Sequence, residues 1–274
     1  MKSIFSIIFI FIASYVWSQN VGQQGDSLVN YKDINGHKHG KWTKQYESGK
    51  TAYIAHFKND KLVGLYQRFY PNGKLIMEVN YEDNESGYAK LYYDDGTLLA
   101  EGHYIQKNIK DGLWKFYGTD GKLVVETNYE KGIINGKQTK YYRNGNKMEE
   151  IDLINGKKDG LWTRYFENGK ERMKARMIND KRNGLLYVYY PSGKYYCKGR
   201  YENNLKTGPW VYYNEDGSIK RETEFINGHA DDQEQIDEET TKMIEEWEQM
   251  KGVIPDPDMD NMMNYDQKYS PLRK

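Results

Sequence analysis

The chain has 274 residues, with 40 basic and 40 acidic side chains and therefore no formal net charge. Neutrality argues against a dedicated nucleic-acid binder, and a single cysteine, Cys197, excludes an intramolecular disulfide framework or a multi-thiolate metal site. Mean hydropathy is −0.96 although 15% of the residues are aromatic, so we expect a thin, aromatic-rich architecture rather than a thick aliphatic core or a disordered chain. Cys197 is expected to be a small apolar residue in a strand.

Residues 1–18 have the pattern of a secretory signal peptide. The apolar run is about 14 residues long, short of the roughly 20 residues that a membrane-spanning helix needs. Val16 and Ser18 fit the small-residue rule for cleavage before Gln19; an uncleaved anchor is the alternative. No later stretch is apolar enough to cross a bilayer, so we expect an exported protein that is periplasmic, at the cell surface or secreted. Residues 19–29 form the linker that follows.

A glycine then recurs at nearly constant spacing over residues 30–229. It stands at Gly40, Gly64, Gly87, Gly112, Gly136, Gly160, Gly184 and Gly208, with spacings of 24, 23, 25, 24, 24, 24 and 24 residues. Nine residues after each, a second glycine follows Ser, Asn or Asp, which is the composition of a hairpin turn. Repeats of this length indicate stacked units, because one hairpin cannot bury its own face. We predict an all-β antiparallel meander of eight tandem 24-residue hairpins, with a partial leading strand at residues 28–33.

The repeat resembles that of a known family. Unit 6 reads Gly160, Trp162, Tyr165, Phe166, Asn168, Gly169 and Lys170. This resembles the bacterial variant of the membrane-occupation-and-recognition-nexus (MORN) repeat, Gly-x-Trp-x-x-Tyr-Tyr-x-Asn-Gly-Lys. The resemblance implies a stacked hairpin fold and, for function, a scaffold or membrane-associated interaction module; some bacterial members are labelled antitoxins of toxin–antitoxin pairs. Ala89, Gln138 and Leu186 depart from the pattern, since no ring stands two residues after their glycines.

The turn decides which face of the sheet is buried; positions are counted here from the first glycine of each unit, which is position 0. Pro71 and Pro191 lie two residues before the turn glycine, which favours a three-residue loop with position 6 facing position 10 and the glycine in a left-handed conformation. One face then carries rings at positions 5 and 17, apolar residues at position 11 and small residues at position 15, and we predict that this face is the core. A two-residue turn would exchange the two faces.

The opposite face carries charged residues at position 14, polar residues at position 16, and a ladder of rings at positions 2 and 6. The candidate binding residues on it are Trp42, Tyr66, Tyr70, Trp114, Tyr142, Trp162, Phe166, Tyr190 and Trp210. Exposed rings desolvate readily and dominate interface hot spots, so we predict that they bind another protein. Two alternatives remain open: the rings pack along the sheet for structure only, or they stack on sugars at intervals of about 10 Å, two strand separations.

Residues 230–274 differ in kind from the repeats, with 13 acidic and 5 basic side chains and a net charge of −8. Apolar residues recur there at helical spacing, so residues 230–252 are predicted to form an acidic amphipathic helix and residues 253–274 a flexible tail. The helix either covers the open edge of the last hairpin or binds a partner.

Catalytic and metal-binding motifs are missing from the sequence, which contains no nucleophile elbow, His-Glu-x-x-His or phosphate-cradling glycine loop. His37 and His39 could supply two metal ligands, but no spacing of carboxylates or thiols completes a set. Asp256, Asp258 and Asp260 alternate as in a calcium loop that lacks its glycine and its closing glutamate. We therefore predict no metal and no cofactor.

These observations lead to one functional hypothesis and two alternatives. The first is an exported, non-enzymatic repeat scaffold that binds another protein through an extended aromatic sheet face, and that does not bind nucleic acid. The second is an antitoxin-like or immunity-like protein that neutralises a toxin. The third is a binder of cell-surface glycans.

Overall fold

The computed structural model describes residues 28–82, 85–106 and 108–230, together with residues 232, 234, 237–242 and 245. The predicted signal peptide, most of the linker and the predicted tail at residues 253–274 lie outside these described residues. Within the described part of the chain, no helix is long and apolar enough to cross a membrane.

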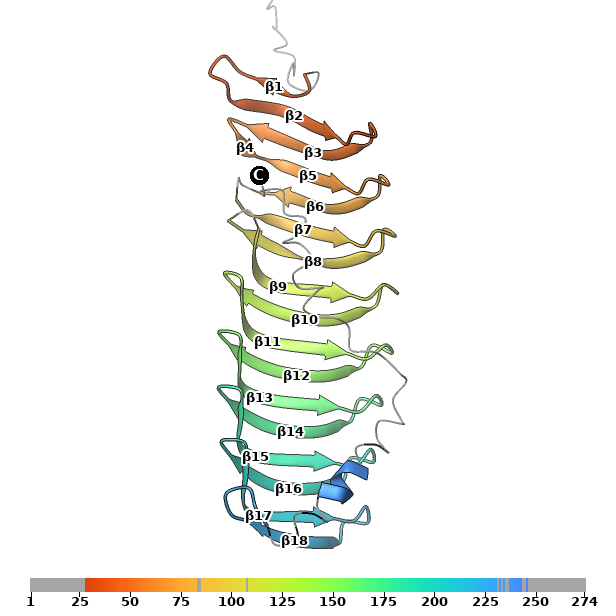
Figure 1. The fold of residues 1–274 in the computed structure, drawn as a ribbon, viewed down its shortest axis with the longest axis vertical. Coiled ribbons are helices and arrows are strands. Elements are labelled where there is room, and N and C mark those ends of the chain that lie inside the picture. Colours follow the sequence, from red (N-terminus) through yellow and green to blue (C-terminus); the bar gives the residue numbers. More distant parts are fainter. Residues whose placement is uncertain are drawn as a thin grey trace, which may run out of the picture.

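In the described part of the chain, eighteen strands form one open antiparallel meander (Figure 1), which confirms the predicted all-β repeat. Successive strands pair with one another except β4 and β5, which both pair with β3. The strands are β1 (Tyr31–Lys32), β2 (Lys38–Gln45), β3 (Thr51–Lys58), β4 (Lys61–Leu62), β5 (Gly64–Phe69), β6 (Leu75–Tyr81), β7 (Gly87–Tyr92), β8 (Leu98–Ile105), β9 (Ile109–Tyr117), β10 (Leu123–Glu130), β11 (Ile133–Tyr141), β12 (Lys147–Ile154), β13 (Lys157–Tyr165), β14 (Glu171–Ile178), β15 (Lys181–Tyr189), β16 (Tyr195–Glu202), β17 (Leu205–Tyr213) and β18 (Ile219–Phe225).

Each hairpin closes with the predicted three-residue turn. In unit 2, the backbone N–H of Tyr70 donates to the carbonyl of Lys74 at 2.8 Å, and the N–H of Gly73 donates to the carbonyl of Tyr70 at 2.8 Å. Gly73 has a φ of 92°, which glycine adopts without steric cost. The same pair of bonds closes all eight units, so the predicted pairing of position 6 with position 10 is confirmed.

A second bulge lies just beyond each turn, and the predicted assignment of faces did not include it. In unit 2, Phe69 pairs with Leu75 and Arg68 pairs with Met77, which leaves Ile76 as an extra residue. The equivalent irregularity occurs in every unit. One extra residue turns all the following side chains to the other face of a sheet. Positions 13, 15 and 17 therefore share a face with positions 2 and 4, not with positions 5 and 11.

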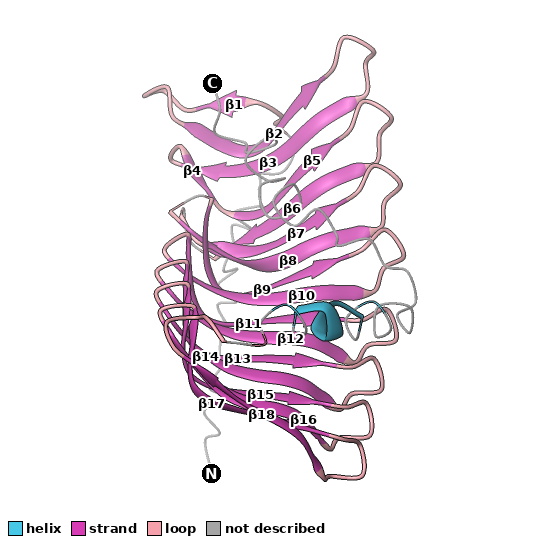
Figure 2. Ribbon diagram, turned by 60° about the horizontal axis from the view of Figure 1, so that its bottom comes forward, coloured by secondary structure: helices cyan, strands magenta, loops and turns pink. Residues whose placement is uncertain are grey.

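The sheet is bent across its strands into a trough, with the inter-unit turns along one rim and the hairpin turns along the other (Figure 2). The bend coincides with position 0, where seven of the eight glycines have a positive φ, such as 67° at Gly112. Lys110 and Trp114 lie on either side of Gly112 along β9, yet the Lys110 ammonium is 5.2 Å from the Trp114 ring centroid. The strand therefore curls toward their side, which we call the inner face; the opposite side is the outer face.

The core lies on the inner face, where each unit packs on its neighbours. One buried cluster runs through units 1–4, another through units 6–8, and a small cluster of Ile151, Leu153 and Met177 lies between them. Position 15 is glycine where Trp114 and Trp210 of the next unit cover it: a Cβ on Gly102 would lie 2.3 Å from the Trp114 ring. The predicted core was thus right for positions 15 and 17 and wrong for positions 5 and 11, which lie on the outer face.

Candidate binding face

All nine predicted binding residues lie on the inner face. Five are buried: Tyr66 (5% exposed), Tyr70 (8%), Trp114 (0%), Tyr142 (6%) and Trp210 (2%). The other four, Trp42, Trp162, Phe166 and Tyr190, are half-buried. The prediction that these rings form a solvent-exposed ladder is therefore wrong, because the second bulge places them on the packed side of the sheet. Their arrangement agrees with the alternative in which they pack along the sheet.

The tyrosines at position 6, which occur in five of the eight units, each bond to the hairpin of the next unit. The hydroxyl of Tyr70 donates to the carbonyl of Tyr92 at 3.1 Å, and the hydroxyl of Tyr142 donates to the carbonyl of Tyr165 at 2.8 Å. Tyr190 makes the same bond to the following unit at 2.8 Å. These tyrosines stabilise the stacking of units, a role that sequence periodicity alone did not reveal.

A column of apolar side chains is exposed along the outer face at position 1. Its members are Leu65 (41% exposed), Tyr88 (44%), Leu113 (47%), Leu161 (48%) and Leu185 (54%), and the exposed Pro209 continues it in unit 8. Lysine interrupts the column at Lys41 and Lys137. From β5 to β17 the column crosses twelve strand separations, or about 58 Å. Apolar groups repeated in this way at the surface are candidates for contact with another macromolecule.

Beside this column, the tyrosines at position 5 form a second ladder with glutamates of the preceding unit. The hydroxyl of Tyr92 donates to Glu78 at 3.0 Å, and Tyr117 donates to Glu101 at 2.7 Å. Burial and then the Glu78 carboxylate raise the pKa of the Tyr92 hydroxyl, so it stays a donor at physiological pH. The same bond recurs in the next two units, from Tyr141 to Glu126 and from Tyr165 to Glu150.

The ladder changes character in units 7 and 8. Tyr189 and Tyr213 of these units face lysines instead of glutamates, because position 14 of the preceding units 6 and 7 is Lys174 and Lys198. Tyr195 stacks on Tyr189 with ring centroids 5.1 Å apart. The ammonium of Lys198 lies 3.6 Å from the Tyr195 ring centroid and 5.2 Å from that of Tyr213, and these two ring centroids are 6.3 Å apart. Next to this group a shallow groove of about 480 Å³ is open on the outer face. Its lining includes Leu185, Lys198, Arg200, Pro209, Val211 and Tyr213.

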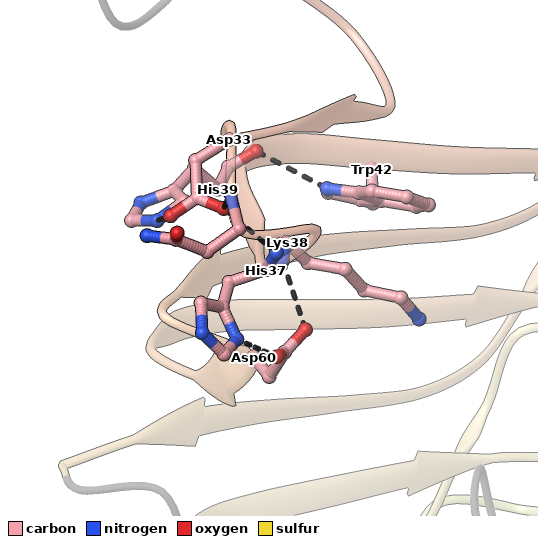
Figure 3. Close-up of polar contacts among 7 residues, drawn as sticks. Asp33, His37, Lys38, His39, Trp42 and Asp60 are labelled. Carbon is pink, nitrogen blue, oxygen red and sulfur yellow. Dashed lines mark hydrogen bonds and ion pairs between the residues drawn. The ribbon is translucent and has the colours of Figure 1, made fainter.

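His37 and His39 each contact a different carboxylate and do not form a shared set of metal ligands (Figure 3). Nδ1 of His37 lies 2.6 Å from Asp60, whose other oxygen accepts the backbone N–H of Lys38 at 2.8 Å. Nε2 of His39 lies 3.3 Å from Asp33. The bond to Asp60 raises the pKa of His37. Among the residues that the structure describes, no group of three or more His, Cys, Asp or Glu side chains could hold a metal ion.

Cys197 is buried in β16, where it pairs with Val188 and Tyr212 on the inner face. Burial raises its pKa to about 12, so the thiol stays protonated and unreactive. It packs as the small apolar strand residue that the sequence predicted.

Within the predicted helix at residues 230–252, residues 234, 237–242 and 245 are helical. The helix lies at the end of the sheet formed by β16–β18 (Figure 1). Glu239 lies 2.9 Å from the ammonium of Lys220, and Asp232 lies 3.1 Å from the hydroxyl of Thr223, both in β18. The described part of the acidic segment therefore contacts β18.

Eight stacked hairpins with glycine-marked bends and turns define a solenoid-like repeat protein whose units are stabilised by their neighbours. The comparison with known families agrees with this class. The MORN repeat variant matches residues 38–59, 62–83, 85–106, 110–131, 134–155, 158–174, 182–203 and 206–227. The chain belongs to the MORN repeat variant family. No curated protein sequence matches it.

Proposed function

We propose that the protein is an exported, non-enzymatic scaffold that binds another protein through the outer face of its sheet. The observation that carries this proposal is the apolar column at position 1, whose large side chains are 41–54% exposed in five of the eight units. Exposed apolar groups in one line can be buried together by a single elongated partner.

The end of the column in units 7 and 8 adds the features of an interface centre. The groove next to Leu185 and Pro209 gives a partner side chain a place to insert, and the Tyr195 group supplies rings and a cation beside it. Tyrosine is enriched at interface hot spots because it combines large apolar area with a hydrogen-bonding group. We therefore expect the strongest contacts at this end and weaker, additive contacts along the leucines.

The test is capture of a partner by the full chain from its native envelope, with two double variants compared. Leu161→Lys with Leu185→Lys places charges in the outer-face column, and the expected result is loss of the captured protein. Ile154→Lys with Ile178→Lys is the matched control, because these side chains are also 53% and 38% exposed but lie at the ends of strands next to the inter-unit turns. The control should capture as well as the unmodified chain. Equal capture by both variants would refute the outer face as the binding surface.

The identity of the captured protein separates the more specific hypotheses. A toxin among the captured proteins would support the antitoxin-like alternative. The glycan alternative loses its predicted platform at Trp114 and Trp210, because rings that are 0% and 2% exposed cannot stack on a sugar. Export is tested by fractionation of cells and by sequencing the mature N-terminus, which should begin at Gln19.

A further inference from the structure

One row of directly paired side chains crosses the inner face from β2 to β18. It consists of Lys44, Tyr53, Arg68, Met77, Leu91, Ala100, Phe116, Val125, Lys140, Glu149, Arg164, Met173, Val188, Cys197, Tyr212 and Arg221. The row is apolar over β6–β10 and again over β14–β17. Between these stretches it is polar at Lys140, Glu149 and Arg164, which we call the polar centre. This centre separates the two large buried clusters.

Glu149 is the acidic member of the polar centre, and its carboxylate is shared. It lies 3.7 Å from the ammonium of Lys140 and 3.6 Å from Nε of Arg164, and it accepts the indole N–H of Trp162 at 3.0 Å. Lys140 and Arg164 share this one carboxylate, which leaves a positive surplus, and their side chains are still 28% and 38% exposed. A third inner-face cation, Lys158, lies 5.2 Å from the Trp162 ring centroid. This part of the trough is suited to additional carboxylates.

The other polar end of the same row shows how such cations are covered. Arg221 lies 3.6 Å from Asp232 and 3.6 Å from Glu239, and Lys220 beside it lies 2.9 Å from Glu239. The acidic segment that follows the repeats therefore already contacts inner-face cations in unit 8.

The remaining sequence continues that acidic character. Residues 246–266 contain six acidic side chains and one basic side chain, a net charge of −5. Five strand separations, about 24 Å, lie between Arg221 and Arg164, whereas 21 extended residues can span about 70 Å. A tethered segment is also present at a high effective concentration, so it outcompetes a free acidic peptide of similar affinity.

We propose that residues 246–266 of the same chain bind along the inner face and place carboxylates on the cations of units 5 and 6. The trough is then filled intramolecularly, from its C-terminal end toward its middle. This inference concerns the inner face alone, so it stands or fails independently of partner binding on the outer face.

The test is zero-length carbodiimide cross-linking of the full, unmodified chain, followed by peptide mass spectrometry. We expect links from Lys140 or Lys158 to carboxylates within residues 246–266, with a yield that does not depend on protein concentration. The link between Lys220 and Glu239 is the positive control, since these groups are 2.9 Å apart. Lys115 is the negative control, because it lies on the outer face 3.8 Å from Glu126 and should link only there. The new links should disappear at 1 M salt, where the Debye length is about 3 Å.

A variant of the acidic segment tests whether its carboxylates form the new links, without changing a residue of the folded repeats. Replacing Asp256, Asp258 and Asp260 together by Asn should reduce the links to Lys140 and Lys158 and leave the Lys220 control unchanged. The proposal is overturned if the control link forms while Lys140 and Lys158 give none. It is equally overturned if the yield of links from Lys140 and Lys158 rises with protein concentration, which would identify a second copy as the occupant. Links from these two lysines to another protein alone would also overturn it.

Discussion

Replacing Trp114 by Ala tests most directly which face of the sheet is the core. The ring is fully buried, lies 4.8 Å from the Tyr104 ring and covers Gly102, and its indole N–H donates to the carbonyl of His103 at 3.0 Å. Truncation of a buried tryptophan costs about 3–5 kcal/mol. We expect the upper half of that range, because a glycine beneath the ring offers no side chain to fill the cavity.

The neighbouring residue provides a matched control. Leu113 lies on the outer face and is 47% exposed, so Leu113→Ala removes only part of a leucine's burial and should cost about 1 kcal/mol. Urea unfolding followed by tyrosine and tryptophan fluorescence measures both variants, with the shift in midpoint compared at constant slope. Equal losses of stability for the two variants, or a loss below about 1 kcal/mol for Trp114→Ala, would refute the assignment of faces.

Three further changes probe the packing, the stacking bonds and the N-terminal ion pair. Gly199→Ala should destabilise by about 1–3 kcal/mol in urea, since a Cβ there would lie 2.1 Å from the Trp210 ring; an unchanged midpoint would mean that the ring can move aside. Tyr142→Phe removes one inter-unit hydrogen bond and should cost about 0.5–1.5 kcal/mol, with faster hydrogen exchange in the adjoining turn; unaltered exchange would contradict that role. His37 has a raised pKa, chiefly because of its hydrogen bond to Asp60. Its contribution to the stability of the fold is therefore fully present below its unfolded pKa of 6.5 and is lost as the pH rises through the folded pKa. Amide hydrogen-exchange protection factors in unit 1 should therefore be larger at pH 5.5 than at pH 8. The variant His37→Gln should abolish this difference.

The architecture was predictable because it depends on features that recur at fixed positions. Spacing of glycines gave the unit length, and Asn-Gly or Asp-Gly gave the hairpin turns. Proline at Pro71 and Pro191 selected the three-residue turn that the hydrogen bonds of Tyr70 and Tyr190 confirm. Each of these signals is local, so it does not depend on knowing what the chain packs against.

The assignment of faces failed because it required knowledge of a second, less visible irregularity. A bulge leaves two neighbouring residues on the same side of a strand, so it interrupts the alternation of apolar and polar residues. That interruption was present in the sequence as the adjacent apolar pairs Ile76 with Met77, and Val124 with Val125. Counting alternation separately on each side of such pairs would have placed the tryptophans in the core. The exposed leucines at position 1 carry no comparable signal, since exposure at the bend is a result of the curl of the sheet.

The repeated side chains of the inner face are needed for folding, whereas many of those on the outer face are not. This difference indicates where specific recognition of a partner should lie. On the inner face rings such as Trp114 and Tyr142 contact a neighbouring unit, so a substitution there that altered specificity would also alter stability. On the outer face the hydroxyls of Tyr92 and Tyr117 are already bonded to glutamates, which leaves mainly apolar area for a partner. Lys174 and Lys198 remove that acceptor in front of Tyr189 and Tyr213. The leucine column can therefore supply affinity along the whole sheet, whereas discrimination between partners should reside in units 7 and 8, where lysines face the tyrosines and a groove is open.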